Sequence, residues 1–190
     1  LDDYRLEIET FTNCALKDIE ARKDKESKIA GIVSATETKI AKNGNPYCRF
    51  TLEDFDGTYN FALFGKDYMA FKTFIETPAA LLHITGKYQT RWDGKEYEFK
   101  IQKIDLLPDI RSKLTKSLTL ELGLNEVNEN LLNELQALIA KYPGKLRLRF
   151  KIRDEEEGIM LGMNAAASSI ELSNDLLKEL DTMHIEYSLN

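Results

Sequence analysis

Cysteine, histidine and proline are scarce in this chain. Its 190 residues include two cysteines, two histidines and four prolines. Cys14 lies in a polar stretch and Cys48 in a predicted strand, a pattern typical of reduced thiols, so we expect a cytoplasmic protein without a disulfide framework. His83 and His184 have no cysteine or carboxylate at the spacing of a zinc site. The sequence therefore predicts no metal centre.

Long apolar runs and catalytic signatures are missing as well. No apolar run approaches the roughly 20 residues that a membrane-spanning helix needs, so we expect no membrane role. The sequence has no glycine-rich phosphate loop followed by Lys and Ser or Thr, and no Gly-x-Ser-x-Gly motif. It also lacks a set of strand carboxylates able to hold two Mg²⁺ ions. We expect this chain to carry no catalytic residues and no cofactor.

Positive charge is not in excess. The formal net charge is −6, whereas a protein that binds nucleic acid by bulk attraction usually has a strongly basic footprint. Over residues 28–106, Lys and Arg number 11 and Asp and Glu number 10, so this region is nearly neutral while its flanks are acidic. Any contact with nucleic acid therefore depends on local patches.

The first 27 residues predict a helical lead and linker. They begin at Leu1 without a Met or a secretory leader, and we interpret the chain as a piece of a longer protein. Their apolar positions are scattered and end in the charged run of residues 20–26, which is typical of a solvated segment.

Residues 28–110 predict a closed five-stranded barrel. Turn signals and alternating apolar residues give strands over 28–39, 47–53, 58–64, 80–91 and 95–107, with a helix over 66–75. The third strand is apolar at every position from Phe61 to Phe64, so we expect both of its faces to be covered. Three strands, a helix and two strands are the element order of the oligonucleotide/oligosaccharide-binding (OB) fold.

Residues 111–190 predict a small α+β domain. A polar link is expected over 108–115. Helical spacing of leucines and alternation of apolar residues then give the order β-α-β-β-α-β, with helices over 128–141 and 173–183 and strands over 117–122, 146–153, 158–163 and 185–189. The predicted fold class is an OB barrel followed by this α+β domain.

The residues that form these elements resemble a known family. Residues 29–33 (Ile-Ala-Gly-Ile-Val), the basic loop 39–45, residues 50–54 (Phe-Thr-Leu-Glu-Asp) and Phe61–Phe64 are similar to the OB domain of the bacterial DNA polymerase III alpha subunit. The lead Leu1-Asp-Asp-Tyr4 also resembles the segment before that domain. The tail resembles the family's last region in its leucine-rich helix, in Tyr142-Pro-Gly144 and in the closing helix at 176–180.

The resemblance implies a function in the bacterial replisome. It implies an accessory module of a replicative DNA polymerase, in which the OB barrel binds single-stranded DNA template and the tail domain contacts the clamp-loader τ subunit. The parent protein would be a DNA-directed DNA polymerase, a nucleotidyltransferase, whose catalytic aspartates lie upstream of this fragment.

Two alternatives stay open. The motif at residues 50–54 followed by Gly57 is also found in OB domains of aminoacyl-tRNA synthetases, so the barrel would be a tRNA-binding appendage. The net negative charge instead favours a protein-interaction adaptor without nucleic-acid affinity.

Candidate binding residues cluster at the two hairpin tips of the barrel. OB folds bind strands with aromatic platforms and cations near their second and third strands. The first patch is Lys39, Lys42, Tyr47 and Arg49, and the alternative is a solvated hairpin tip. Tyr59 either stacks a base or packs in the core. The second patch is Arg91, Trp92, Lys95 and Tyr97.

The tail domain has one basic strand face. Arg147, Arg149, Lys151 and Arg153 alternate with apolar residues, which suggests phosphate contact. The acidic run at residues 154–157 follows at once, so we expect a hairpin whose charges balance internally.

Overall fold

The chain folds into two compact units. The structure, a computed structural model, describes residues 1–42, 44–91 and 94–190, and of residues 166–168 it describes the backbone alone. Unit 1 comprises Leu1–Lys113 and unit 2 comprises Leu114–Asn190. The sequence boundaries were expected after residues 27 and 110.

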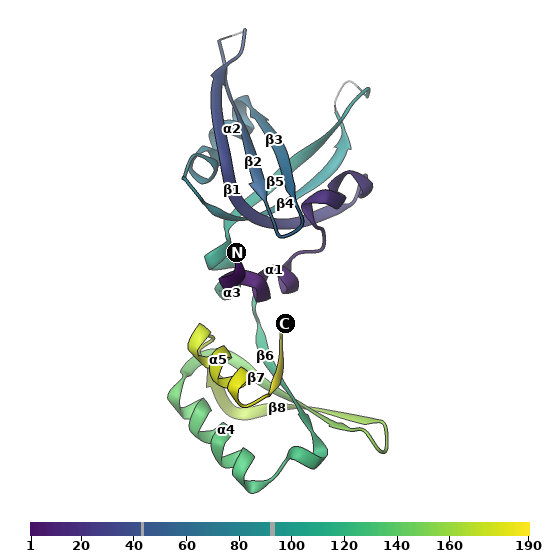
Figure 1. Ribbon diagram of the computed structural model, residues 1–190, viewed down its shortest axis with the longest axis vertical. Coiled ribbons are helices and arrows are strands. Elements are labelled where there is room, and N and C mark those ends of the chain that lie inside the picture. The colour runs from purple at the N-terminus through teal and green to yellow at the C-terminus, as the bar shows by residue number, and fades with distance from the viewer. Residues whose placement is uncertain (43, 92–93) are drawn as a thin grey trace. The chain divides into compact units, whose positions relative to one another are not determined.

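Unit 1 is built on a five-stranded antiparallel sheet with the order β3-β2-β1-β4-β5 (Figure 1). Its strands are β1 (Glu26–Ile40), β2 (Pro46–Glu53), β3 (Thr58–Phe64), β4 (Leu81–Thr90) and β5 (Tyr97–Leu106), and helix α2 (Gly65–Ile75) follows β3. β1 pairs with both β2 and β4, and the helix separates the third and fourth strands, as in an OB fold. The predicted fold class is therefore confirmed.

The sheet is not closed by its backbone, which corrects the expected closed barrel. β3 and β5 are its edges, and no ladder joins them in the part of the chain that the structure describes. Their side chains do meet, because the rings of Phe61 and Phe99 lie edge to face with centroids 5.6 Å apart. Register shifts between Val33 and Ala35 and at Gly86 bend the sheet. Aromatic rings thus take the place of the last ladder.

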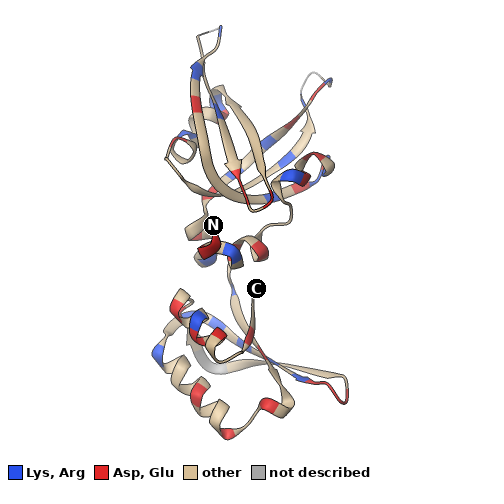
Figure 2. Ribbon diagram, viewed as in Figure 1, with Lys and Arg blue, Asp and Glu red and all other residues tan. Residues whose placement is uncertain are grey.

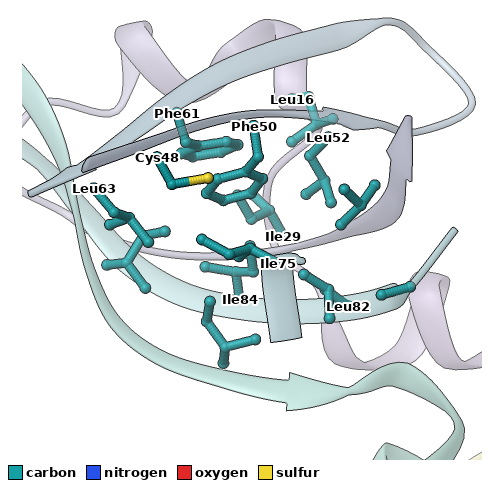
Figure 3. Close-up of a cluster of buried hydrophobic side chains, with 14 of the residues drawn as sticks. Leu16, Ile29, Cys48, Phe50, Leu52, Phe61, Leu63, Ile75, Leu82 and Ile84 are labelled. Carbon is teal, nitrogen blue, oxygen red and sulfur yellow. The ribbon is translucent and has the colours of Figure 1, made fainter. Parts of the chain in front are cut away.

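The concave side of the sheet encloses the core of unit 1 (Figure 3). Alternation along β2 points Cys48, Phe50 and Leu52 inward, and all three are fully buried. Ile75 at the end of α2 and Ile84 of β4 complete this cluster from other elements. Neighbouring parts of the curved sheet can pack this closely because glycine occupies two of the strand positions. A Cβ at Gly86, for example, would overlap the Phe99 ring and the Lys100 carbonyl oxygen.

The expected lead packs onto the sheet instead of forming a separate segment. It contains η1 (Asp2–Tyr4), α1 (Arg5–Phe11) and η2 (Leu16–Ala21). Leu16 and Ile19 of η2 are buried in the core of unit 1. α1 packs on the other face of the sheet, where Ile8 and Phe11 contact the cluster around Ala30.

The expected polar link at 108–115 is mostly helix. α3 (Leu107–Leu114) starts directly after β5 and buries Leu107 and Ile110 against the same cluster as α1. Pro108 lies in its first turn, where the missing N–H costs nothing because that group has no helical partner. Arg111 pairs with the buried Glu7 of α1 at 2.5 Å and ties the two helices together.

Unit 2 has the predicted element order β-α-β-β-α-β. Its elements are β6 (Ser117–Gly123), η3 (Leu124–Glu126), α4 (Glu129–Lys141), β7 (Pro143–Asp154), β8 (Ile159–Ile170), α5 (Asn174–Thr182) and β9 (Glu186–Leu189). The sheet order is β8-β7-β6-β9, with only β6 and β7 parallel. Asn128 and Ser173 cap α4 and α5 through their side chains. Lys141 and Tyr142 both donate to Glu179 of α5, so the two helices lie on one side of the sheet.

The close approach at Gly86 generates a stability prediction. We expect Gly86→Ala to lower the free energy of unfolding by about 1 to 3 kcal/mol, because the added methyl must displace Phe99 or strand backbone. Gly57→Ala is the matched control, since its Cβ would meet nothing within 4 Å. Urea unfolding followed by circular dichroism measures both. Equal stability of the two variants would contradict the tight contact.

His83 generates a prediction about pH. Burial lowers the pKa of His83 below its ordinary value of 6.5, against the opposing effect of Asp105, and its Nε2 lies 3.1 Å from the Phe11 carbonyl oxygen. The folded protein thus holds His83 neutral while the unfolded chain takes up a proton, so stability falls as pH drops through about 6.5. We expect the loss of stability between pH 7.5 and pH 5.5 to be smaller in His83→Gln. Urea midpoints at both pH values test this, and equal losses would refute it.

Candidate nucleic-acid interface

The outer face of β1, β2 and β3 brings the first candidate patch together. Because directly paired residues share a face, the register places three cross-strand rows side by side. The rows are Lys39, Tyr47 and Phe64; then Glu37, Arg49 and Ala62; then Ala35, Thr51 and Asn60. Three of the four residues predicted for this patch therefore lie on one surface, and Lys42 lies in the adjoining turn.

An exposed aromatic stack lies in the first row. The rings of Tyr47 and Phe64 are 5.2 Å apart at an interplanar angle of 18°, and Phe64 is 49% exposed. A stacked pair with one half-exposed ring offers the kind of platform on which a nucleobase stacks. Phe64 was not among the predicted site residues, because both faces of β3 were expected to be covered. Ala62 and Phe64 are in fact exposed.

The second and third rows form a shallow pocket of about 440 Å³ next to this stack. Ala35 and Ala62 have small side chains, so they form the floor of the pocket, and the larger side chains around them form its rim. The hydroxyl of Thr51 donates to the Asn60 amide oxygen at 2.7 Å, which leaves the Asn60 amide nitrogen directed elsewhere as a donor. The pocket thus combines an apolar floor with polar groups at its rim.

The cations of this face differ in how far they are neutralised. Lys39 pairs with Glu37 at 2.9 Å, an exposed contact that salt and solvent weaken. Arg49 is exposed, and among the described residues no carboxylate lies within ion-pair distance of it. Lys42 is exposed in the turn after β1. Arg49 and Lys42 are therefore the cations most available to a phosphate.

The second predicted patch, at the β4–β5 hairpin, is more strongly self-paired. Arg91 contacts Glu96 at 3.1 Å and Glu98 at 3.3 Å, so its charge is locally balanced. Tyr97 stacks on Tyr88 with centroids 5.4 Å apart. Trp92 lies outside the described residues, and Lys95 is exposed in the hairpin turn.

A residue of the lead joins the second patch. The Lys23 ammonium lies 4.5 Å from the centre of the Tyr97 ring, a cation–π contact. Sequence reasoning missed Lys23 because the charged run in which it lies was expected to be a solvated linker. The sequence signal was its position three residues before the start of β1, whose partner β4 leads to this hairpin.

Tyr59 lies apart from both patches. It pairs with the buried Leu52 in the β2–β3 ladder and therefore points to the concave side of the sheet. Its ring tilts against Phe61 at 4.8 Å. Burial raises the pKa of Tyr59 to about 12, and the negative charge of Glu20 adds to this effect. Its surroundings are those of a core residue.

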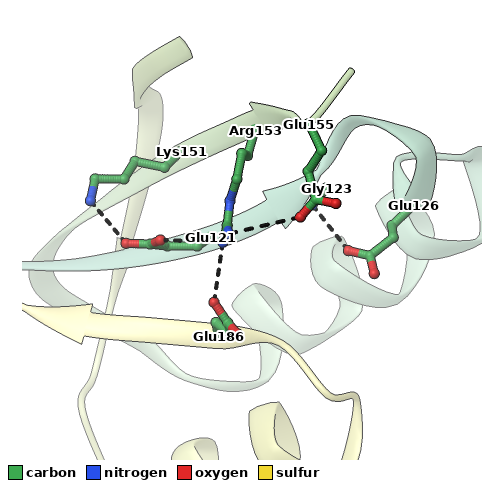
Figure 4. Close-up of polar contacts among 7 residues, drawn as sticks. All are labelled: Glu121, Gly123, Glu126, Lys151, Arg153, Glu155 and Glu186. Carbon is green, nitrogen blue, oxygen red and sulfur yellow. Dashed lines mark hydrogen bonds and ion pairs between the residues drawn. The ribbon is translucent and has the colours of Figure 1, made fainter. Parts of the chain in front are cut away.

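Two of the four basic residues on one face of β7 in unit 2 are paired across the sheet (Figure 4). Lys151 contacts Glu121 of β6 at 2.9 Å, and Arg153 contacts Glu186 of β9 at 3.3 Å. From the acidic run that was expected to supply this balance, Glu155 alone pairs with Arg153, at 3.9 Å. The partners come from neighbouring strands because charges on one sheet face meet across strands.

Metal clusters and membrane-spanning helices are both absent from the described residues. Across residues 1–42, 44–91 and 94–190, no three His, Cys, Asp or Glu side chains gather closely enough to hold a metal ion. Among the helices formed by those same residues, none has the length and apolar character to cross a membrane.

Comparison with curated proteins finds DNA polymerase III subunit alpha from several bacteria. The Haemophilus influenzae protein is 26% identical over 144 residues, which cover 74% of this chain and 12% of that protein. The Saccharopolyspora erythraea protein is 28% identical over 140 residues, covering 70% of this chain and 11% of that protein. The chain thus spans about an eighth of the length of these relatives.

Two solved structures are similar to part of the chain. One is the mitochondrial single-stranded DNA binding protein Rim1 from S. cerevisiae, at 21% identity and a TM-score of 0.33, covering 44% of this chain and 93% of that one. The other is the second OB-fold domain of replication protein A from Methanococcus maripaludis, at 16% identity and a TM-score of 0.32, covering 49% and 94%.

A family model places the tail of the chain. The model of the C-terminal domain of the DNA polymerase III alpha subunit matches residues 118–190, which begin one residue after the start of β6 and end with the last residue of unit 2. The full-length relatives extend the similarity over most of the chain. Residues 118–190 are therefore similar to the C-terminal domain of the DNA polymerase III alpha subunit, and most of the chain is similar to that protein.

Proposed function

We propose that unit 1 binds single-stranded DNA on the outer face of β1, β2 and β3, as an accessory module of a replicative DNA polymerase. The observation that carries this proposal is the exposed Tyr47–Phe64 stack beside Arg49, which has no carboxylate partner among the described residues. Similarity to DNA polymerase III subunit alpha supports the replicative setting. Polymerisation itself would belong to a longer protein, outside these 190 residues.

Stacking would give this face its preference for single strands. An open ring face at Phe64 can accept a base only if that base has left its own helical stack, which single strands allow and duplexes resist. Such a contact is worth about 1 to 3 kcal/mol per base and tolerates any sequence, because every base has a π face. The alanine-floored pocket beside the stack offers room for a neighbouring nucleotide.

Electrostatics would add a moderate, salt-sensitive contribution. Lys42 and Arg49 are open to phosphates, whereas Lys39 must exchange Glu37 for a phosphate. Arg91 is held by two carboxylates, so the second patch would contribute mainly through Tyr97 and its neighbours. Few free cations on a chain of net charge −6 favour modest affinity, which suits a strand that must move past the protein.

Unit 2 we assign to protein docking. On the basic strand face, Lys151 and Arg153 are paired within the sheet, which leaves Arg147 and Arg149 to contact a partner. Exposed Ile159, Met160 and Leu161 at the β7–β8 hairpin favour an apolar interface. The family resemblance of the tail suggests the clamp-loader τ subunit as the partner, in the cytoplasm of a bacterium.

One other function has an observation in its favour. The net charge of −6 and the Lys39–Glu37 pair favour an adaptor that binds proteins alone. This function requires the Tyr47–Phe64 surface to bind no single strands. A tRNA-binding appendage of a synthetase would instead bind tRNA more tightly than single-stranded DNA.

Removing the aromatic platform tests the proposed DNA site. We expect Phe64→Leu to weaken binding of a labelled dT20 oligonucleotide about 5- to 150-fold, since it removes the ring but keeps an apolar side chain. Fluorescence anisotropy gives the affinity. Phe55→Leu is the matched control, because Phe55 is similarly exposed at 44% and lies at the opposite end of the β2–β3 hairpin. Equal affinities for the two variants would leave the adaptor as the better function.

Removing the two open cations tests the electrostatic contribution. In Lys42→Ala/Arg49→Ala we expect weaker binding and a salt dependence whose logarithmic slope is flatter by about 1.4, at roughly 0.7 per phosphate contact with a single strand. Titrations of dT20 from low to high salt measure the slope. Both side chains are exposed, so the fold should be unaffected. A slope unchanged from wild type would remove these residues from the site.

A further inference from the structure

β8 is an edge strand without the usual protection of edges. It lies at one end of the order β8-β7-β6-β9. Its regularly paired part, Ile159–Asn164, has no Lys, Arg, Asp or Glu (Figure 2) and no Pro, and beyond it the ladder shifts register between Arg149 and Arg147 of β7. The unpaired N–H and C=O groups of an edge attract other strands, and proteins normally deter this with charges, proline or short edges. The uncharged stretch Ile159–Asn164 therefore leaves its outer backbone groups open to pairing with another strand.

One face of this edge is apolar and continues the core of unit 2. The β7–β8 register places Leu161 opposite Ile152 and Met163 opposite Phe150. Ile152 in turn neighbours the buried Leu122 of β6. Ile159, Leu161 and Met163 are 59%, 56% and 42% exposed, so the apolar face continues past the area that the unit covers by itself.

The opposite face of the hairpin carries basic side chains of which some have no acidic partner among the described residues. Lys151 and Arg153 are matched by Glu121 and Glu186 (Figure 4). Arg147 and Arg149 are exposed, and within the described part of the chain neither has a carboxylate in ion-pair range. Arg149 lies opposite Asn164, and the next residue of β8 on that face is Gly162, which leaves the space above it open.

We propose that the Ile159–Asn164 edge of β8 binds an extended segment of a partner protein whose alternate side chains are apolar and acidic. The segment adds a fifth strand to the sheet. Its backbone pairs with β8, its apolar side chains lie beside Leu161 and Met163, and its acidic side chains face Arg149. This inference rests on the docking role proposed for unit 2 and names the surface and the chemistry of the partner.

A second copy of the chain fits this edge less well. Pairing β8 with its own copy would bring no carboxylate to Arg149, because Ile159–Asn164 of the second copy contains no Asp or Glu. An acidic strand of another protein would supply the missing carboxylates.

A synthetic strand tests the proposal on the full 190-residue chain. The probe is a labelled ten-residue peptide of alternating Val and Glu, N-methylated along one edge so that it cannot form fibres. Comparison peptides replace Glu by Gln, or carry N-methyl groups on both edges so that no strand pairing is possible. We expect anisotropy to show binding of the Glu peptide, weaker binding of the Gln peptide and no binding of the doubly methylated one.

Three variants locate the contact. Leu161→Thr/Met163→Thr keeps β propensity but removes the apolar side chains, and we expect it to weaken peptide binding at least tenfold. Arg149→Gln should abolish the preference for Glu over Gln. Leu132→Gln is the control, because Leu132 is 51% exposed on α4 and is not part of the sheet. It should bind the peptide as wild type does.

Several outcomes would overturn the proposal. Equal binding of the doubly methylated peptide, or no peptide binding at all, would exclude strand addition. A wild-type dimer in sedimentation that dissociates in Leu161→Thr/Met163→Thr would make a second copy the occupant. If purified τ subunit binds this variant as well as wild type, docking stands and the β8 edge is wrong. If τ binds neither while the peptide binds wild type alone, the edge stands and that docking partner is wrong.

Discussion

One bent strand, β1, holds unit 1 together. Its first half pairs with β4 and its second half with β2, and Ile32 pairs on both sides, with Leu81 and with Glu53. A strand can serve both halves of a curved sheet only if it bends sharply at the point of exchange. The register shift at Val33 and the glycine at position 31 provide this bend, since a Cβ at Gly31 would overlap the Glu53 carbonyl oxygen. This bend in β1 produces the curvature of the sheet, which encloses the core on one side and exposes the outer face of β2 on the other.

Much of this architecture could be predicted from short-range patterns. β3 has the predicted bounds, and the caps of α4 and α5 lie at Asn128 and Ser173, because turns and caps depend on a few adjacent residues. The closure of the sheet could not be predicted in the same way. Whether β3 and β5 pair depends on the total curvature that the bends in β1 and β4 give to the sheet. The alternation of apolar and polar residues carries no information about that curvature.

The misses share a physical cause, which is burial by residues distant in sequence. Leu16 and Ile19 looked scattered in a polar lead, but they complete the core from a segment that has no regular period of its own. α3 was not predicted because Pro108 usually ends a helix. Its place in the first turn of α3 can be recognised only when Leu107 is known to be buried. Phe64 was the opposite case, an aromatic residue that looked covered and is exposed. Three of the predicted site residues lie together because strand pairing in a hairpin fixes which side chains share a face.

The burial of the lead in unit 1 bears on how the protein is made. Leu16 and Ile19 leave the ribosome before the strands of unit 1, but the core that they complete extends to Ile101 and Ile104 of β5. Contacts between such distant positions slow folding, because a long loop of chain must close before any of them forms. During synthesis the lead therefore waits in water, with its apolar side chains open to chaperones, until about 80 further residues have emerged. A fragment that began at β1 would lack Leu16 and Ile19 and would expose the core residues that these two side chains cover.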